Sequence, residues 1–200
     1  MAHTGDDKLV LCAVNALRDF SEIFNKFEEY LNSNLVRGKR ERLRVFKRRM
    51  NEVVEEYEME GAKNTIIISG VVEALEELKG MGIKLAVVTN NSIRPTSLTL
   101  QKIGLEAFFD IILTREAIKF MKPHTQPIET VLKRLGIQAS EAIFVGDSPL
   151  DMKAARTAGV VAIGVTTGIA SEETLRASGA EHVLPSLRQL PSMIKGIHSQ

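Results

Sequence analysis

The sequence predicts an α/β protein: a Rossmann-like, three-layer, doubly wound parallel sheet with a small inserted helical cap. Short apolar runs alternate with amphipathic segments along most of the chain. The runs are apolar throughout, which is typical of parallel strands buried on both faces. Strands that alternate with helices imply right-handed crossovers between parallel neighbours. One stretch, residues 18–64, holds no strand-like run and therefore indicates an insertion.

The composition is that of an ordinary globular protein. The 200 residues are 44% hydrophobic and 26% charged with a net charge of +1, which suits one core domain and argues against a polyelectrolyte. The single cysteine, Cys12, excludes an internal disulfide and fits a reducing compartment. No apolar run reaches the roughly 18 residues that span a bilayer, and Leu9–Leu17 is too short for a signal-peptide core. We expect a cytoplasmic protein without a membrane partner.

Six apolar runs are the expected strands, with amphipathic segments between them. The runs are Leu9–Val14, Ile83–Val88, Phe108–Leu113, Ala142–Val145, Val161–Val165 and His182–Leu184. Two of the amphipathic segments place apolar residues at helical spacing: Val71, Leu75 and Leu78; and Ile128, Val131, Leu132 and Leu135. Leu98, Ile103 and Leu105 close another segment. Gly136 follows the last of these segments as a helix stop signal.

Residues 18–64 are expected to form a helical-hairpin cap on a core made of residues 1–17 and 65–200. Two apolar stripes are predicted to pack against each other, with a turn at Asn32–Gly38 between the helices. The stripes are Phe20, Phe24, Phe27 and Leu31, and Leu43, Phe46, Met50, Val53 and Tyr57. A cofactor role for these aromatic residues is the alternative, and a packed core is the favoured interpretation.

The second cap helix changes the sign of its charge along its length. Arg37–Arg49 holds eight basic residues and one acid, and five glutamates follow from Glu52 to Glu60. Basic residues at a helix start oppose the helix dipole, so helix stability does not explain this order. Arg37–Arg49 is a candidate site for an anionic macromolecule. A solvated face with pairs such as Arg48 with Glu52 is the favoured alternative.

Polar residues follow the second run, where an open α/β sheet binds its ligands. Thr89-Asn90-Asn91-Ser92 supplies hydroxyls, amides and backbone N–H groups that suit an anion such as phosphate. A simple helix cap by Asn91 or Ser92 is the alternative.

The segment Lys122-Pro123-His124 follows the third run. Pro123 restricts the backbone beside Lys122, and a lysine there could neutralise a phosphate as a point charge. His124 could carry a proton, although a lone loop histidine usually has no such role.

The strongest single motif is Gly146-Asp147-Ser148-Pro149-Leu150-Asp151, directly after the fourth run. Two acids four residues apart, with a glycine before them and a proline at a helix start, form an oxygen-rich corner. Such a corner suits Mg²⁺ held by one or two carboxylates, water and substrate phosphate. The alternative is helix capping by Asp147 or Ser148 with Asp151 in the first turn, which leaves the glycine and the second acid unexplained.

These motifs, in this order at successive strand ends, closely resemble the haloacid dehalogenase superfamily, especially its phosphoglycolate phosphatase-like branch. The similarity extends from Leu9 to about Lys195. Gly70–Leu78 looks like the helix before the family's second motif, and Val160–Gly168 looks like its late strand and loop. The helical hairpin falls where the family carries its first type of cap.

The resemblance implies the roles of a phosphate-monoester hydrolase site. By this resemblance Thr89 and Asn90 would bind the phosphoryl group, and Lys122 would neutralise it. Asp147 would ligate Mg²⁺, and Asp151 would support the metal directly or through water.

The first strand departs from the family pattern, which is Asp-x-Asp-Gly-Thr. In the family the first aspartate attacks phosphorus, and the second is the general acid and base. One alignment places Ala13 and Asn15 at these positions and the other places Cys12 and Val14 there, so neither supplies a carboxylate. Alanine cannot attack phosphorus, and asparagine cannot transfer the proton.

Whether the chain is an enzyme is therefore open between three hypotheses. The favoured one is a catalytically impaired family member that binds a small phosphorylated ligand and holds Mg²⁺ weakly or vestigially. The second is an active Mg²⁺-dependent phosphatase of small phosphate esters with atypical first-strand chemistry; Cys12 as a thiolate, or Asp19 or Asp6-Asp7 as the missing acid, are less favoured substitutes. The third is an adaptor that binds an anionic partner through Arg37–Arg49. The oligomeric state cannot be read from the sequence.

Overall fold

The central element is a six-stranded, wholly parallel sheet with the strand order β3-β2-β1-β4-β5-β6. The structure is a computed structural model that describes residues 9–13, 24–26, 28–29 and 37–197. The strands are β1 (Leu9–Ala13), β2 (Lys84–Val88), β3 (Ile111–Leu113), β4 (Ala142–Gly146), β5 (Val161–Val165) and β6 (His182–Leu184). The order reverses on either side of β1, which confirms the doubly wound topology and places the ligand crevice beyond the carboxyl end of β1.

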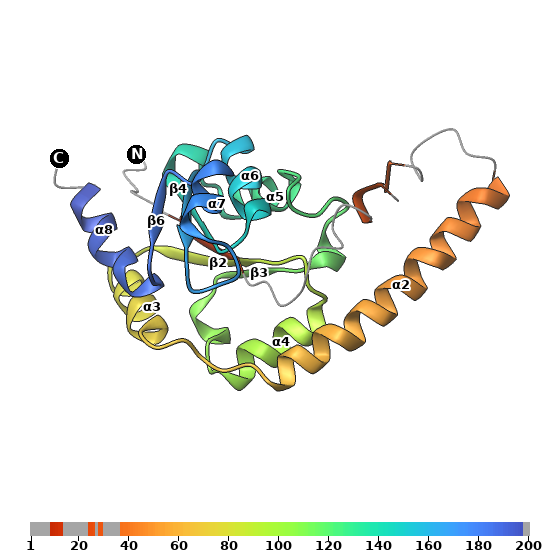
Figure 1. Cartoon of the computed structure of the whole chain (residues 1–200), viewed down its shortest axis with the longest axis horizontal. Helices are drawn as coiled ribbons and strands as arrows, with labels where there is room; N and C mark the ends of the chain where they lie inside the picture. The colour runs from red at the N-terminus through yellow and green to blue at the C-terminus, as the bar shows by residue number, and fades with distance from the viewer. Residues whose placement is uncertain (1–8, 14–23, 27, 30–36, 198–200) are drawn as a thin grey trace, which may run out of the picture.

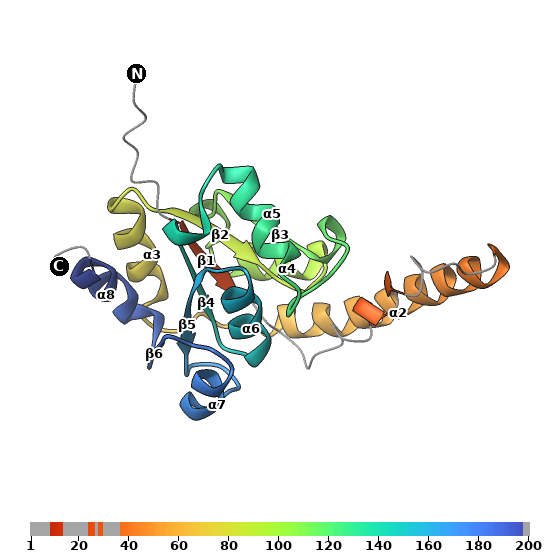
Figure 2. The ribbon, with the colours of Figure 1, turned by 90° about the horizontal axis from the view of Figure 1, so that it is seen from above.

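Helices cover both faces of the sheet and complete the three layers (Figures 1 and 2). They are α3 (Val71–Gly80), α4 (Ile93–Lys102), α5 (Gln126–Leu135), α6 (Pro149–Thr157), α7 (Glu172–Ala177) and α8 (Leu190–Ile197), with 3-10 turns at Glu106–Phe108, Arg115–Ala117, Ala139–Glu141 and Leu187–Gln189. The Gly136 stop signal is confirmed, because this residue ends α5 with a left-handed φ of 69°. Within the described part of the chain, no helix combines the length and apolarity needed to cross a membrane.

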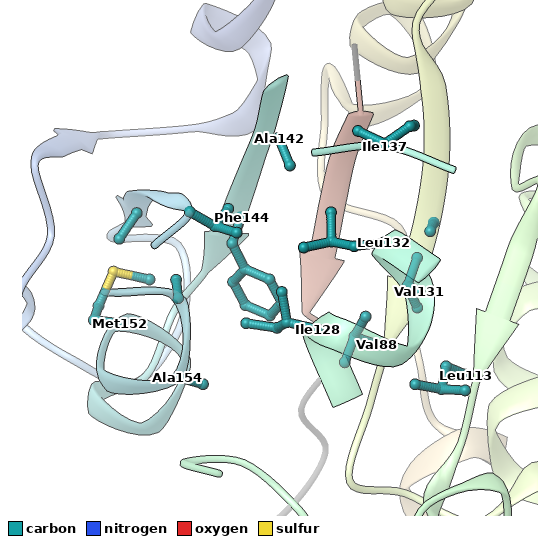
Figure 3. Close-up of a cluster of buried hydrophobic side chains, with 14 of the residues drawn as sticks. Val88, Leu113, Ile128, Val131, Leu132, Ile137, Ala142, Phe144, Met152 and Ala154 are labelled. Atoms are coloured by element: carbon teal, nitrogen blue, oxygen red, sulfur yellow. The ribbon is translucent and has the colours of Figure 1, made fainter. Parts of the chain in front are cut away.

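The strands alternate their side chains between two hydrophobic cores. Along β2, Ala86 and Val88 face the core under α5, α6 and α7, whereas Leu85 and Val87 face the core under α3, α4 and α8. Figure 3 shows the first core, in which Phe144 of β4 lies among residues of α5 and α6. Burial on both faces explains why the strand runs are apolar throughout.

Three strand boundaries differ from the prediction, and the start of β3 differs most. The run Phe108–Leu113 was expected to be a strand, but only its last three residues pair with β2. Phe108 instead ends a 3-10 turn. Asp110 then caps the start of the pairing, because its carboxylate accepts the N–H of Leu85 at 2.8 Å and its own N–H donates to the Leu85 carbonyl at 2.8 Å. Ile83 lies before β2, and Gly146 extends β4.

Helix α2 (Arg37–Lys63) projects away from the sheet as a long arm (Figures 1 and 2). Its 27 residues correspond to a length of about 40 Å. Arg37 and Gly38 are helical, so the predicted turn at Asn32–Gly38 was wrong at its end, and residues 32–36 lie outside the described part. The division into a core and a cap stays a prediction.

The second half of α2 is fastened to α4. Arg94 of α4 contacts Glu55 at 3.2 Å, and the Lys102 ammonium donates to the carbonyl of Lys63 at the end of α2. The described helical residues 24–26 and 28–29 also pack on α2, where Phe24 is buried with Val54. Lys47, in the first half of α2, also contacts the Glu28 carboxylate, so the described contacts of the arm are not confined to its second half.

The predicted apolar stripe of α2 is not the buried one. Phe46, Val53 and Tyr57 are 54%, 63% and 70% exposed. The buried residues of α2 are spaced by four and are Val54, Glu58 and Ala62, with Met50 half-buried beside them. Phe24 of the other predicted stripe does pack in the same cluster as Met50, which confirms the predicted contact between the stripes at this point. Residues 20, 27 and 31 lie outside the described part, so the rest of that contact stays a prediction.

Candidate functional site

The carboxyl ends of three adjacent strands frame the candidate site. Strand β1 pairs with β2 on one side and β4 on the other, with Ala13 opposite Val88 and Cys12 opposite Val145. Thr89 follows β2 directly and Asp147 follows β4 directly, so these two residues flank the end of β1. The predicted site residues that follow β2 and β4 therefore lie at one edge of the sheet.

A buried ion pair between Lys122 and Asp151 lies at the centre of this edge. The Lys122 ammonium is 2.7 Å from Oδ1 of Asp151, and the two side chains are 1% and 0% exposed. The same ammonium donates to the carbonyl of Val88 at 3.0 Å and lies 5.5 Å from the centre of the Phe144 ring. Two buried charges are tolerated because each is paired and hydrogen-bonded.

Asp151 is held by its own helix start. Ser148 is the N-cap of α6, and its hydroxyl donates to Oδ2 of Asp151 at 2.6 Å while accepting the Asp151 N–H at 3.3 Å. Gly146 passes so close that a Cβ there would lie 2.5 Å from the Cβ of Asp151. The glycine, the capping serine and the second acid of the motif therefore form one packed unit.

Asn90 positions Lys122 through two hydrogen bonds to its backbone. Its Oδ1 accepts the Lys122 N–H at 3.1 Å, and its Nδ2 donates to the Lys122 carbonyl at 3.2 Å. The sequence predicted Asn90 as a direct phosphate ligand, whereas its side-chain amide links two loops. The neighbouring Thr89 is fully buried, and its hydroxyl accepts the Asn91 N–H at 3.1 Å. This turn begins directly after β2, beside the end of β1.

A second buried ion pair, which the sequence did not predict, joins this loop to α2. The Arg115 guanidinium contacts the Glu58 carboxylate through two nitrogens, at 2.8 and 3.3 Å. It also donates to the Ser92 hydroxyl and, at 3.2 Å, to the carbonyl of Asn90. Glu58 accepts the Ser92 N–H at 2.9 Å. The spacing of Glu58 from Val54 on the inner face of α2 was the available signal.

Asp147 is half-buried and close to the loop after β5. A Cβ on Gly168 would lie 1.9 Å from Oδ2 of Asp147, so the loop can approach only because that residue is glycine. An apolar groove of about 630 Å³ opens beside Asp147. It runs between α3 and α4 and is rimmed by Ile66–Ile68 and Thr167–Ile169. The site therefore offers a carboxylate beside an apolar wall.

The described residues fit Mg²⁺ only in part. They contain no group of three or more His, Cys, Asp or Glu side chains that could hold a metal ion. Both oxygens of Asp151 already contact Lys122 or Ser148. Asp147, which follows β4 directly, is the other carboxylate of the motif, and Mg²⁺ is commonly held by one or two carboxylates together with water and substrate phosphate.

The remaining candidates are separate from the site or outside the described residues. His124 is exposed, stacks on Phe120 with 4.7 Å between ring centres and accepts the Gln126 N–H at 3.0 Å, so it helps to start α5. Cys12 and Ala13 are placed only as backbone positions of β1. Asn15 and the alternative acids at positions 6, 7 and 19 lie outside the described part of the chain.

The fold and site define a class of doubly wound α/β proteins with a lysine–aspartate pair and a Gly-Asp-x-x-x-Asp turn at the switch point of the sheet. Comparison with known proteins identifies the family. A haloacid dehalogenase-like hydrolase model matches residues 18–165, which is well over half of the chain. This chain belongs to the haloacid dehalogenase-like hydrolase family.

Individual relatives agree with this assignment. The chain is 35% identical over 140 residues to the pyrophosphatase PpaX of Bacillus velezensis, covering 70% of this chain and 60% of the relative. It is 35% identical over 124 residues to the phosphoglycolate phosphatase of Pectobacterium atrosepticum, covering 62% and 53%. The matches therefore span little more than half the length of these curated relatives.

Solved structures match over nearly the whole chain. A subfamily IA hydrolase of the superfamily from Geobacter sulfurreducens has a TM-score of 0.63 at 26% identity, covering 94% of this chain and 99% of that one. A predicted phosphoglycolate phosphatase from Haemophilus somnus has a TM-score of 0.70 at 21% identity, covering 96% and 99%. The second likeness supports the fold alone.

Proposed function

We propose that this chain binds a small phosphorylated ligand at the carboxyl edge of the sheet and is strongly impaired as a hydrolase. One contrast carries the proposal. The Lys122–Asp151 ion pair is formed, and Asn90 hydrogen-bonds to the Lys122 backbone. In contrast, the sequence of residues 9–17 contains no carboxylate. Loss of a nucleophile from a site whose groups act together costs on the order of 10⁶ in kcat.

In this proposal Lys122 and Thr89 bind the phosphoryl group. An ammonium has three N–H bonds, and Asp151 and Val88 accept two of them among the described residues. The third N–H would meet a phosphoryl oxygen. Burial strengthens such a contact, because the local dielectric is lower than that of water. The groove beside Asp147 favours a ligand whose phosphate is joined to an apolar group.

Mg²⁺, which the family resemblance implies, would be held by Asp147 with support from Asp151. Bound there, the ion would neutralise phosphoryl charge. With one well-placed carboxylate, the affinity for Mg²⁺ would depend on the ligand's own oxygens, so the ion and the ligand would bind together.

The second candidate is an active phosphatase with atypical first-strand chemistry. The observation that favours it is the similarity to relatives named as a pyrophosphatase and a phosphoglycolate phosphatase. The nucleophile would then come from a residue such as Cys12 or from an acid outside the described part of the chain.

Two measurements on the same samples separate the candidates. Binding of phenyl phosphate is followed by calorimetry with and without Mg²⁺, and hydrolysis of p-nitrophenyl phosphate is followed by absorbance. We expect Mg²⁺-dependent binding that Asp147→Asn weakens about tenfold or more, corresponding to one charged contact, and no turnover above the buffer rate. Glu129→Gln, an exposed acid on α5, is the matched control.

The outcomes are distinct. The wild-type protein could hydrolyse p-nitrophenyl phosphate, with the activity abolished by Asp147→Asn and unchanged by Glu129→Gln. This result would contradict the proposal of an impaired hydrolase and favour the active phosphatase. Absence of phenyl phosphate binding by a folded wild-type protein would overturn the ligand site itself.

A further inference from the structure

The groove beside Asp147 is apolar along almost all of its wall. Its volume of about 630 Å³ lies within the range of about 300–1,000 Å³ that is typical of small-ligand sites. The wall is built by α3, α4 and neighbouring loops, and it includes Leu75 of α3, Ile103 of α4 and Phe109. Among the described residues that line the groove, Asp147 is the one charged side chain, and the other polar side chains are threonines. The groove therefore suits an uncharged, apolar group.

Four exposed isoleucines lie at the rim of this groove. They are Ile66, Ile67 and Ile68, which lie between α2 and α3, and Ile169, which lies in the loop after β5. Ile66 and Ile169 are 83% and 79% exposed, more than any other large hydrophobic residue that the structure describes. Exposed apolar side chains that gather around a concave site are typical of ligand-binding grooves. An apolar group that enters the groove would cover these side chains and remove their surface from water.

Asp147 joins the groove to the carboxyl edge of the sheet. It follows β4 directly, and it also lines the groove. A ligand with its phosphoryl group at this edge would direct its ester group past Asp147 into the groove. A second anionic group inside the groove would lie near the Asp147 carboxylate and, among the described lining residues, would meet no basic side chain. Burial of a charge without a partner is costly, so the groove disfavours such a ligand.

We propose that this protein selects phosphate monoesters of apolar alcohols, and that Ile66 and Ile169 determine this specificity; the proposal rests on the phosphate site proposed above. Pyrophosphate and phosphoglycolate, the compounds after which two relatives are named, carry a second anionic group in place of an apolar one. They fit the groove less well. A lipid surface is also disfavoured, because anionic membranes attract basic residues and the described lining of the groove contains none.

A series of alkyl phosphates of increasing length tests whether the groove binds the ester group. Calorimetry in the presence of Mg²⁺ gives the affinity of the wild-type protein for ethyl, butyl and hexyl phosphate and for phosphoglycolate. Burial of one CH₂ group raises an affinity by up to about fourfold. We therefore expect the affinity to rise from ethyl to butyl to hexyl phosphate, by up to about fifteenfold at each step. Phosphoglycolate should bind no more tightly than ethyl phosphate.

Two variants at the rim test where the ester group binds. Ile66→Asn and Ile169→Asn should each reduce the gain in affinity from ethyl to hexyl phosphate severalfold, while the affinity for ethyl phosphate itself stays unchanged. Ile93→Asn is the matched control, because Ile93 of α4 is also exposed and lies outside the groove. This control should keep the full gain. Thermal melts show whether the three variants keep the fold, as the exposure of these side chains leads us to expect.

The failure of this proposal is distinguishable from the failure of the phosphate site. Equal affinities for the three alkyl phosphates would overturn the specificity and leave the phosphate site intact. Tighter binding of phosphoglycolate than of butyl phosphate, or an undiminished gain in both rim variants, would have the same consequence. If no compound of the series binds, the phosphate site and its specificity are both overturned. Binding to vesicles of phosphatidylcholine and phosphatidic acid, without binding of free hexyl phosphate, would assign the groove to a lipid surface instead.

Discussion

Two buried ion pairs contact the loop after β2, and they differ in the elements that supply their partners. Lys122–Asp151 lies at the edge of the sheet, where the Val88 carbonyl of β2 and the Ser148 hydroxyl at the start of α6 hydrogen-bond to it. Arg115–Glu58 joins that edge to the arm α2. The first pair lies in motifs that follow strands, so the sequence revealed both partners. In the second pair the acid, Glu58, lies on the inserted helix α2. A search for polar residues at the ends of strands could not find it.

The comparison predicts that breaking Lys122–Asp151 has the largest effect on stability. Lys122→Met leaves the Asp151 carboxylate buried without its cation, which typically costs about 3–5 kcal/mol. Chemical denaturation measures the loss, with Lys133→Met, an exposed lysine of α5, as the control. A loss no larger than that of the control would mean that the site edge does not depend on this pair.

Breaking Arg115–Glu58 is expected to have a smaller and more local effect. Glu58→Gln keeps the shape and one acceptor but removes the charge, and hydrogen bonds to charged groups contribute about 1.5–3 kcal/mol. Hydrogen exchange should accelerate in the second half of α2 and in α4, while β4 and β5 stay protected. Glu55→Gln removes a more exposed partner, that of Arg94, and serves as the control. Equal acceleration throughout the sheet would erase the distinction between the two pairs.

The smallest effect is expected at a third, surface-exposed pair. Burial alone would raise the pKa of Asp110, but the Leu85 N–H and the Lys79 ammonium at 3.1 Å outweigh it, so the pKa is lowered below 3.8. A lowered folded-state pKa means that Asp110 stabilises the fold above its ordinary pKa. That contribution is lost as the pH falls through the lowered value.

Asp110→Asn should therefore lower the melting temperature slightly near neutral pH, and the difference between the two proteins should shrink as the pH falls below 3.8. Thermal melts across this pH range give the difference. A gap between the two proteins that widens in acid would reverse the assigned sign.

Much of the fold was predictable because the strands are buried on both faces. Uniform apolar runs identified all six strands, and β5 and β6 match their predicted bounds. The run at Phe108–Leu113 failed in its first half, since hydrophobicity cannot show that Asp110 caps the strand. The prediction of the buried face of α2 was wrong at Phe46, Val53 and Tyr57, because a second set of residues has the same helical spacing. That second set is the buried one, and hydrophobicity could not identify it because it contains the charged Glu58.

The candidate site was predictable as a location and less so as a set of roles. The sequence brought Thr89, Lys122 and Asp147 to one edge, as the strand register confirms for the residues after β2 and β4. The sequence could not show that the Asn90 amide hydrogen-bonds to the Lys122 backbone, 32 residues away. The ligand roles of these residues, the Mg²⁺ site and the cytoplasmic location stay predictions.

Asn90 touches both ion pairs: its amide holds the backbone of Lys122, and its carbonyl accepts from Arg115. A ligand that moves Asn90 would also disturb its contact with Arg115, which in turn binds the Glu58 carboxylate on α2. Coupling free energies between two binding sites are reciprocal. If ligand binding strengthens the Arg115–Glu58 contact, weakening that contact by Glu58→Gln must lower the ligand affinity, so the ligand affinity of this variant would report on the coupling.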